Sequence, residues 1–295
     1  MTRYGRGVSE GHTGEGGGRS FERVAGELRA RMADGRYALH ALLPPQRELA
    51  EEFSVSRDTV QRVLKELKSE GWIESRQGSG SRVIRTQQIH SPTSSKRPDR
   101  MVTLGPLISE AFEQPEVTLD VFTLTSESLD AHIRLQTERI RAELIAPQSI
   151  NLRMLLPDES LDFPYWRTKG GANDGILKER LLGITRRHTA SLRSVLSDLK
   201  TMGLVPSVDF EIRQARLVPT FKLYLVNKVA ALHGPYQTFQ RKIVLEDGRE
   251  IEAVDVFGLG AQLTHHVKDE DPYSPGTVFV ETHQSWFDSA WRYLT

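Results

Sequence analysis

Between positions 56 and 65 the chain carries side chains whose types and spacing suit the reading of nucleic acid. Arginine and glutamine pair with base edges in the major groove, and arginine and lysine also bind phosphates. Ser56 is of the type that caps a helix N-terminus, where free backbone amides attract an anion. The residues that follow and could contact DNA are Arg57, Asp58, Thr59, Gln61, Arg62 and Lys65. This stretch predicts a helix that turns one polar face toward duplex DNA.

The other side of the same stretch is apolar, as a helix anchored in a core requires. Val60, Val63, Leu64 and Leu67 follow the i, i+3, i+4, i+7 pattern, and Gly71 supplies a stop. Two shorter apolar patterns precede it and predict two further helices. The first begins at an N-cap at Ser20 and ends at Gly35; the second follows Pro44-Pro45 and buries Leu49, Ala50 and Phe53.

After this helix the pattern changes to two short strands joined by a small-residue turn. Trp72 and Ile73 open the first strand, and Val83 and Ile84 lie in the second. The small side chains let the backbone approach the minor groove or its phosphates. The candidate DNA contacts in and beside this turn are Arg76, Gln77, Gly78, Ser79 and Gly80, with Arg82 just beyond. Three helices followed by such a wing predict a winged helix-turn-helix.

A characteristic motif runs through this region in the segments Leu43–Ala50, Phe53–Val60, Leu67, Glu70–Ile73 and Gln77–Gly80. Through these residues the chain resembles the GntR family of bacterial regulators over about residues 20–85. The resemblance implies that Arg47 binds the DNA backbone, that Ser56 and Arg57 contact phosphate and base edges, and that Gly78 lies near the minor groove. Gln61 departs from the family, which usually has arginine there. Because glutamine pairs with adenine and arginine with guanine, either the operator differs or Arg62 takes over.

Composition and charge favour two globular domains without a membrane span. The 295 residues include no cysteine, which excludes disulfides and thiolate metal sites. No apolar run approaches the length of a transmembrane helix, and no secretion signal is visible, so we expect a cytoplasmic, nucleoid-associated protein. Residues 1–100 carry 18 Lys and Arg against 13 Asp and Glu, and the remainder carries 21 against 26. The basic half fits a polyanionic partner.

The chain divides into four predicted parts. Residues 1–19 contain seven glycines and predict a disordered leader. Residues 20–85 form the winged helix-turn-helix, and residues 86–100, rich in serine and proline, predict a linker. Residues 101–295 predict an effector-binding and dimerisation domain. The fold class is therefore α+β, with an N-terminal winged helix-turn-helix and a C-terminal mixed α/β domain.

Within the C-terminal domain, strand-like runs alternate with helical patterns. The hairpin turn at 246–249 contains Asp-Gly, which suits tight turns. The predicted strands are Val117–Leu124, Ile150–Leu156, Val208–Leu217, Phe221–Val226, Gln237–Leu245 and Ile251–Phe257. The predicted helices are Leu129–Ile145, Ile176–Met202 and a terminal one from about Thr282 within Phe279–Leu294.

A second, weaker resemblance concerns residues 218–227 and the phospholipase D superfamily. That superfamily carries His-x-Lys-x4-Asp, and here Thr220, Lys222 and Asn227 stand at those positions; Phe287–Trp291 resembles the tail of such domains. Threonine cannot replace an imidazole nucleophile. The resemblance implies a catalytically dead domain with a phosphate-sized effector pocket near these three residues. The alternative is a buried strand with one snorkelling lysine.

The remaining polar and aromatic clusters favour structural roles. His265 and His266 adjoin Asp269–Asp271, but neighbouring histidines in a polar loop favour solvation, so we expect no metal and no cofactor. His233–Tyr236 reads as a turn between strands. Trp286 and Trp291 read as packing residues of the terminal helix, with an aromatic pocket wall as the alternative.

Together these patterns predict a sequence-specific DNA-binding transcription regulator rather than an enzyme. The expected form is a homodimeric repressor on a palindromic double-stranded operator, controlled by a small-molecule or protein effector. Two alternatives stay open. One is a DNA-targeted phosphodiesterase or nuclease of the phospholipase D type, and the other is an effector-independent architectural or plasmid-maintenance protein.

Overall fold

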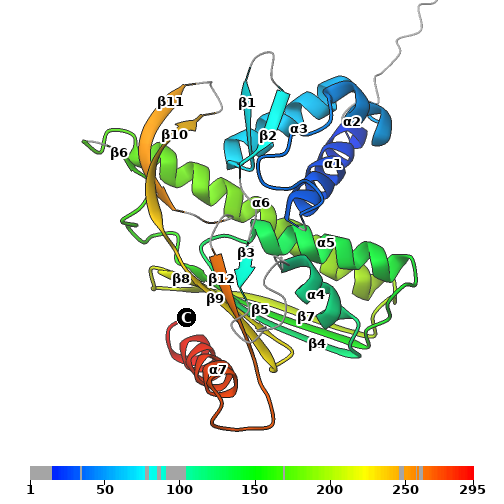
Figure 1. Cartoon of the computed structure of the whole chain (residues 1–295), viewed down its shortest axis with the longest axis vertical. Coiled ribbons are helices and arrows are strands. Elements are labelled where there is room, and N and C mark those ends of the chain that lie inside the picture. The colour runs from blue at the N-terminus through cyan, green and yellow to red at the C-terminus, as the bar shows by residue number, and fades with distance from the viewer. Residues whose placement is uncertain are drawn as a thin grey trace, which may run out of the picture.

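The computed structural model places a small N-terminal domain against a larger α/β domain (Figure 1). It describes residues 15–33, 35–76, 80–84, 88–90, 104–168, 170–245, 249–256, 258 and 262–295. The fold class predicted from the sequence is confirmed, since three helices and a two-stranded sheet precede a mixed helical and stranded domain. None of the helices in these ranges is long and apolar enough to cross a bilayer.

The N-terminal domain has the predicted winged helix-turn-helix order. Its helices are α1 (Glu15–Ala33), α2 (Gln46–Glu52) and α3 (Arg57–Glu70), and its strands are β1 (Ile73–Arg76) and β2 (Gly80–Val83). The strands pair antiparallel, with Ile73 opposite Val83. The apolar residues that the sequence assigned to the second and third helices lie in one buried core with Trp72 and with Val24, Leu28 and Met32 of α1. This confirms the predicted apolar faces.

The start of α1 differs from the prediction. The helix begins at Glu15, so Ser20 lies inside it and does not cap it. Glycines favour disorder in an isolated chain, but the helix here is anchored further along by Val24 and Leu28, which are fully buried. The first part of the predicted leader, residues 1–14, lies outside the described residues.

The larger domain is built on a seven-stranded sheet with the order β3-β12-β9-β8-β4-β5-β7. Parallel pairing joins β4 to β5, β5 to β7 and β12 to β3, and the other neighbours are antiparallel. The strands are β3 (Gln88–His90), β4 (Glu116–Phe122), β5 (Ser149–Pro157), β7 (Ser207–Ala215), β8 (Phe221–Val226), β9 (Ala230–Pro235) and β12 (Gln262–Val267).

Helices cover both faces of this sheet (Figure 1). On one face lie α4 (Leu104–Phe112), α5 (Glu127–Arg141) and α6 (Asp174–Thr201), and on the other lies α7 (Pro275–Tyr293). Side chains of β8 alternate between the two layers: Tyr224 and Val226 join the α5–α6 core, whereas Leu223 and Leu225 join the α7 core. By the same alternation Lys222, two residues before Tyr224, lies on the α5–α6 side of the sheet.

A second sheet lies next to the N-terminal end of α6. It has the order β10-β11-β6, with β6 (Arg167–Thr168), β10 (Thr238–Val244) and β11 (Glu250–Val256). Phe163, Tyr165 and Trp166 form its core with the start of α6. The tip of the predicted hairpin between β10 and β11, residues 246–248, is outside the described part of the chain.

Several predictions for the larger domain are wrong at particular elements. Part of the predicted linker is strand β3, which pairs with β12. No local sequence pattern predicts this pairing. The predicted turn at His233 lies in β9, and His265 and His266 lie in β12 rather than in a loop. Helix α5 ends at Arg141, four residues early, and α7 starts at Pro275, where Ser274 caps it. Helix α4 was not predicted.

Candidate nucleic-acid interface

The N-terminus of α3 is closed by the predicted cap. Ser56 Oγ accepts a hydrogen bond from the Thr59 amide at 3.1 Å, and the two hydroxyl oxygens are 2.9 Å apart. Thr59 is only 8% exposed, so its side chain completes the cap and does not lie on the exposed surface of the helix. Among the residues of this helix that were predicted to contact DNA, Thr59 therefore has a structural role as part of the cap.

The remaining predicted residues on α3 form one exposed polar stripe opposite the buried core. Val60, Val63 and Leu67 are fully buried on the inner side. The C-terminus of the helix is set by Gly71 in the left-handed region, at φ 85°. The exposed outer residues are Arg57, Asp58, Gln61, Arg62 and Lys65. A helix with this division can enter a major groove without disturbing its anchor.

Two flanking cations already have neighbours in the free protein. Arg62 lies over the Phe21 ring at 5.2 Å, a cation–π contact that holds it beside α1. Arg47, on α2, is exposed and donates to Glu51 at 3.0 Å. Since an exposed pair of this kind is weak, a phosphate can replace Glu51 at little cost.

The wing is described only at its two strands. Gly80 is exposed and has φ 77°, a conformation that favours glycine. Arg82 is exposed on β2, whose backbone also bridges to Leu42. Gln77, Gly78 and Ser79 lie outside the described residues, and for Arg76 only the backbone position is described. The predicted wing contacts therefore stay predictions.

The three residues predicted to share an effector pocket do not come together. Thr220 is exposed ahead of β8, and Lys222 is buried near its start. Asn227 lies past the other end of β8, where its amide oxygen accepts from the Thr118 amide and its nitrogen donates to the Ala111 carbonyl. The predicted pocket does not form because a strand extends by about 3.3 Å per residue, and this extension separates positions 222 and 227.

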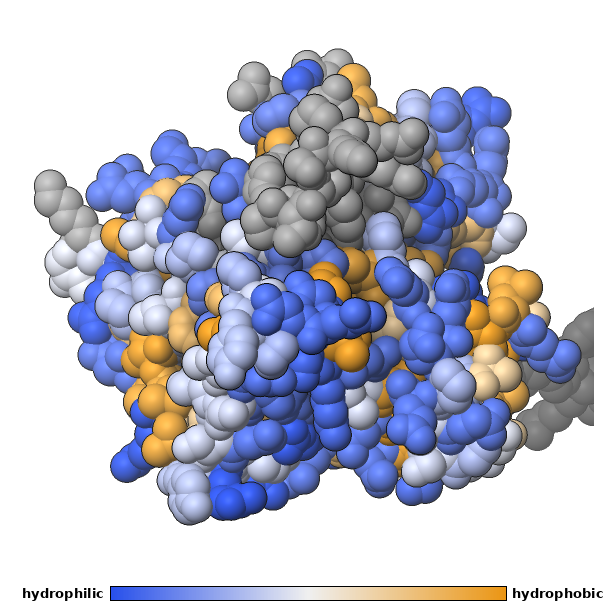
Figure 2. Space-filling model, turned by 60° about the horizontal axis from the view of Figure 1, so that its bottom comes forward, coloured by the Kyte–Doolittle hydropathy of each residue, from blue (hydrophilic) through white to orange (hydrophobic). Residues whose placement is uncertain are grey.

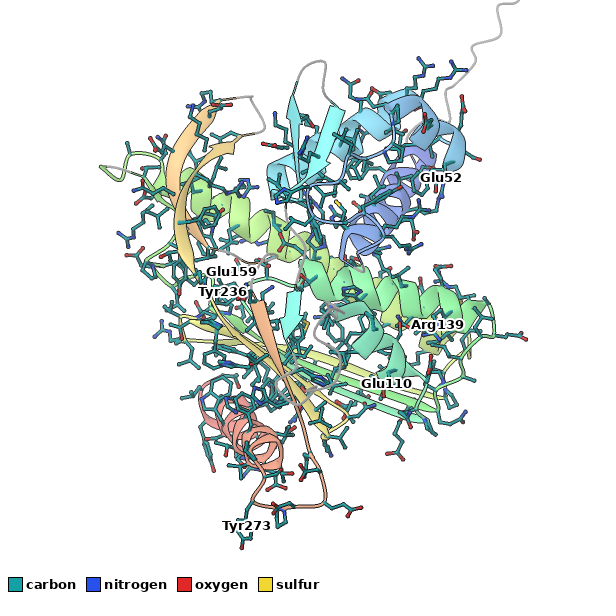
Figure 3. All side chains as sticks on the ribbon, in the orientation of Figure 1. Glu52, Glu110, Arg139, Glu159, Tyr236 and Tyr273 are labelled. Carbon is teal, nitrogen blue, oxygen red and sulfur yellow. The ribbon has the colours of Figure 1, made fainter. Side chains whose placement is uncertain are left out.

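Lys222 is held as a buried side chain beside an aromatic ring. Its Nζ lies 5.9 Å from the centre of the Tyr236 ring, and burial lowers the pKa of Lys222 to about 8. The Tyr236 hydroxyl donates to or accepts from Thr123 Oγ1 at 3.0 Å. Figure 3 shows Tyr236 far from Glu110, which lines the same groove as Asn227. Lys222 and Asn227 therefore belong to different surroundings.

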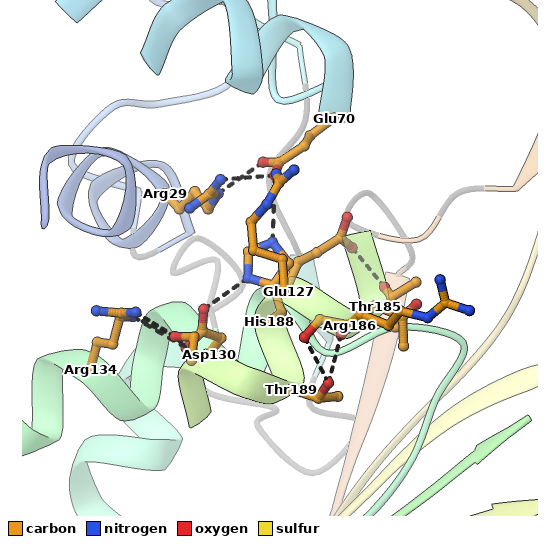
Figure 4. A network of polar contacts seen from close by, with 12 residues as sticks. Arg29, Glu70, Glu127, Asp130, Arg134, Thr185, Arg186, His188 and Thr189 are labelled. Carbon is orange, nitrogen blue, oxygen red and sulfur yellow. Dashed lines mark hydrogen bonds and ion pairs between the residues drawn. The ribbon is translucent and has the colours of Figure 1, made fainter. Parts of the chain in front are cut away.

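The opposite end of α3 enters a buried polar network that joins the two domains (Figure 4). The carboxylate of Glu70, the last residue of α3, accepts two hydrogen bonds of 2.8 Å from Arg29 of α1. His188 Nε2, on α6, lies 3.4 Å from the same carboxylate. All three side chains are almost fully buried. The C-terminal end of α3 is thus fixed to the larger domain.

His188 extends this network to α5. Its Nδ1 lies 2.8 Å from Asp130, which also contacts Arg134 and Ser191. Burial alone would lower the pKa of His188, but the hydrogen bonds to Asp130 and Glu70 outweigh it and raise the pKa to about 9. An imidazolium between two carboxylates results. Arg187, the neighbouring residue, pairs with Glu66 and so adds a second link to α3.

Burial would raise the pKa of the Glu70 carboxyl, yet Arg29 and His188 hold it at about 2. The group therefore stays ionised inside the junction. No pattern in the sequence predicts this network. Glu70 and His188 are 118 residues apart, and neither belongs to a motif that announces a partner. In the described part of the chain, no three His, Asp or Glu side chains are placed to hold a metal ion.

Comparison with known proteins agrees with the geometry of the N-terminal domain. Residues 21–83 match the family described as "Bacterial regulatory proteins, gntR family". They are a GntR-family winged helix-turn-helix. The Exu regulon transcriptional regulator of Escherichia coli K12 is 36% identical over 72 residues, which are 24% of this chain and 28% of that protein.

Other curated relatives and solved structures also match parts of the chain. The HTH-type transcriptional regulator TreR of Bacillus subtilis is 23% identical over 145 residues, 48% of this chain and 59% of its own length. The N-terminal domain of AraR, in a crystal structure with mutant ORR3, is 30% identical with a TM-score of 0.21, covering 22% of this chain and 91% of that one. The chain thus spans less than two thirds of the curated relatives named here.

Proposed function

We propose that this protein is a sequence-specific DNA-binding transcription regulator of the GntR type. The observation that carries the proposal is the exposed polar stripe of α3, which starts at a capped helix N-terminus and lies opposite a buried anchor. Arg57 and Gln61 occupy positions from which they can reach base edges, and Ser56 and Arg47 can hold phosphates.

The proposed active form is a homodimer that represses from a palindromic operator. One winged helix reads one half-site, and two half-sites about 34 Å apart require a two-fold arrangement of two chains. The larger domain would supply the dimer contact and sense an effector. Such an effector can change DNA affinity only through different affinities for the two orientations of the GntR domains.

The junction at Glu70 supports control of this kind. A flexible tether would let the GntR domain move freely, whereas the buried Arg29–Glu70–His188 contacts make its orientation depend on α5 and α6. A ligand that displaces either helix would therefore change the position of α3. This is a route by which binding in one domain can be felt in the other.

Genome-wide footprinting of the full chain, followed by titration of the sites found, tests the proposal. Arg57→Ala is expected to weaken operator binding by about 1–3 kcal/mol with little effect on random DNA, because it reads a base. Arg47→Ala is expected to weaken both kinds of DNA alike and to reduce the slope of affinity against salt by about one. Arg186→Ala, an exposed arginine on α6, serves as the control and should change neither.

Two results would overturn the assignment. Equal losses for Arg57→Ala on operator and random DNA would remove the base-reading role of α3. Footprints without paired half-sites would refute the proposed dimer but not DNA binding by the GntR domain.

A further inference from the structure

A surface groove in the larger domain lies where the sheet extends beyond its helical cover. Helices α5 and α6 share one core with the strands β4, β5 and β7, and α4 packs beside β4 and α5. The groove runs between α4, the β8–β9 turn and β12, with a volume of about 560 Å³. Volumes of 300–1,000 Å³ are usual for small-molecule sites. Figure 2 shows apolar patches scattered among polar side chains on the face of the molecule that it presents.

The walls of the groove are mainly aliphatic. Leu232 and Val226 form its buried floor, and Val229 and Val267 remain 52% and 41% exposed at its rim. Exposed aliphatic side chains gathered at a concave surface indicate a partner more often than scattered ones do. Asn227 also lines the groove, but both ends of its amide are already used by backbone groups. It therefore shapes the wall and does not select a ligand.

One of the lining residues carries an unsatisfied polar atom. His265 lines the groove from β12, and its Nε2 is buried without a hydrogen-bond partner. A buried polar atom left unpaired costs free energy, so a ligand that hydrogen-bonds to it gains affinity. Burial lowers the pKa of His265, so the imidazole is neutral near pH 7 and does not repel a cation.

The charge of the lining is one-sided. Glu110 of α4 and Glu116 of β4 contribute carboxylates, and among the lining residues that the structure describes there is no lysine or arginine. Figure 3 shows Glu110 between α4 and the sheet. From the aliphatic walls, the unpaired imidazole nitrogen and the two carboxylates, we infer that this groove binds a small apolar molecule that carries one positively charged nitrogen.

The position of the groove connects it to the GntR domain. Helix α4 forms one wall, packs against α5 and also touches α1. A ligand that shifts α4 therefore acts on α1 and α5, two of the four helices that contribute to the junction at Glu70. The regulatory part of this inference rests on the proposed DNA-binding function, while the binding site itself does not.

Calorimetric titration of the full chain with three indole compounds tests the ligand class. Tryptamine carries the cation, tryptophol is its neutral counterpart, and indole-3-propionate carries an anion. Tryptamine is expected to bind at least about three-fold more tightly than tryptophol, the size of effect that partly exposed carboxylates supply. Indole-3-propionate should bind most weakly. An anion that binds as tightly as the amine, or no saturable heat from any of the three at millimolar concentration, overturns the inference.

Two variants place the binding in this groove. The double change Glu110→Gln and Glu116→Gln should abolish the preference for tryptamine over tryptophol while leaving tryptophol affinity unchanged. Val267→Arg puts a cation at the exposed rim, away from the core, and should weaken tryptamine more than tryptophol. If the preference survives both changes, the amine binds elsewhere and the site is wrong.

The link to DNA is measured separately. Tryptamine at saturation is expected to change operator affinity of the native chain, and the Glu110/Glu116 variant should require more tryptamine for the same change. Unchanged operator affinity with intact calorimetric binding would refute the regulatory link and keep the site. A chain that binds no DNA at all would refute the proposed function, while the titrations would still decide the groove.

Discussion

The two ends of helix α3 differ in what surrounds them, although they belong to one helix of 14 residues. At the N-terminal end Arg57 and Asp58 are exposed, and the cap at Ser56 satisfies the local backbone. At the C-terminal end Glu70 is buried and bound by Arg29 and His188. One end is free to meet another molecule, and the other is held by the protein itself.

This contrast indicates how substitution of a charged residue at each end should affect binding and stability. An exposed charge is solvated in the folded and unfolded states alike, so its removal changes binding and leaves the fold intact. A buried charge has lost its water, so the removal of its partner leaves it uncompensated. Recognition and attachment to the larger domain are therefore separable along α3.

The largest expected effect is that of Glu70→Ala. It leaves the Arg29 guanidinium buried without its carboxylate, which typically costs about 3–5 kcal/mol of stability. Denaturant unfolding of the full chain measures it. The matched control is Glu51→Ala, which removes the exposed partner of Arg47 and should cost less than about 1 kcal/mol. Similar losses from both variants would mean that the junction is open to water in solution.

The next effect is the pH dependence due to His188. The pKa of His188 in the folded protein is about 9, above its ordinary value of 6.5. Its contribution to the free energy of unfolding is therefore complete below pH 6.5 and is lost as the pH rises through 9. The free energy of unfolding should fall over this window by up to about 3 kcal/mol. His188→Gln is expected to flatten the profile there. A profile that keeps its slope in this variant would assign the titration to another group.

His132 is a buried histidine with the opposite behaviour. It lies in α5 with both ring nitrogens unpaired, and burial lowers its pKa to about 4. As the pH falls, His132 takes up a proton in the unfolded chain before it does so in the folded protein. The contribution of His132 to the free energy of unfolding is therefore complete above pH 6.5 and is lost as the pH falls toward 4. His132→Leu should remove that loss and leave the His188 window unchanged. Unfolding measured between pH 4 and 10 distinguishes the two residues.

The smallest predicted effect compares two helix caps. Ser56→Ala and Ser274→Ala each remove a hydroxyl that accepts a hydrogen bond from the backbone amide three residues on, and each should cost about 1 kcal/mol of stability. Only Ser56→Ala should also weaken DNA binding, because only that cap faces the proposed phosphate. Equal DNA affinity for the two variants would argue against a phosphate contact at Ser56.

The GntR domain could be predicted nearly element by element, because its signals are local. The apolar spacing from Val60 to Leu67, the cap at Ser56 and the stop at Gly71 lie within one helix and its borders. The larger domain was predicted less well. The strand β8 was found from its apolar run, whereas β9 and β12 were missed because His233, His265 and His266 look like loop residues until a neighbouring strand pairs with them.

Local patterns were enough to predict the winged helix-turn-helix, its polar stripe and the resemblance that goes with them, since residues close in the chain set helix periodicity, caps and turns. The folded chain shows that Lys222 and Asn227, five residues apart, lie in different surroundings because β8 is extended. It also brings Glu70 to His188 and lines one groove with both His265 and Glu110. The members of each of these two pairs are more than a hundred residues apart, and their approach depends on how helices and strands pack, which no local pattern records.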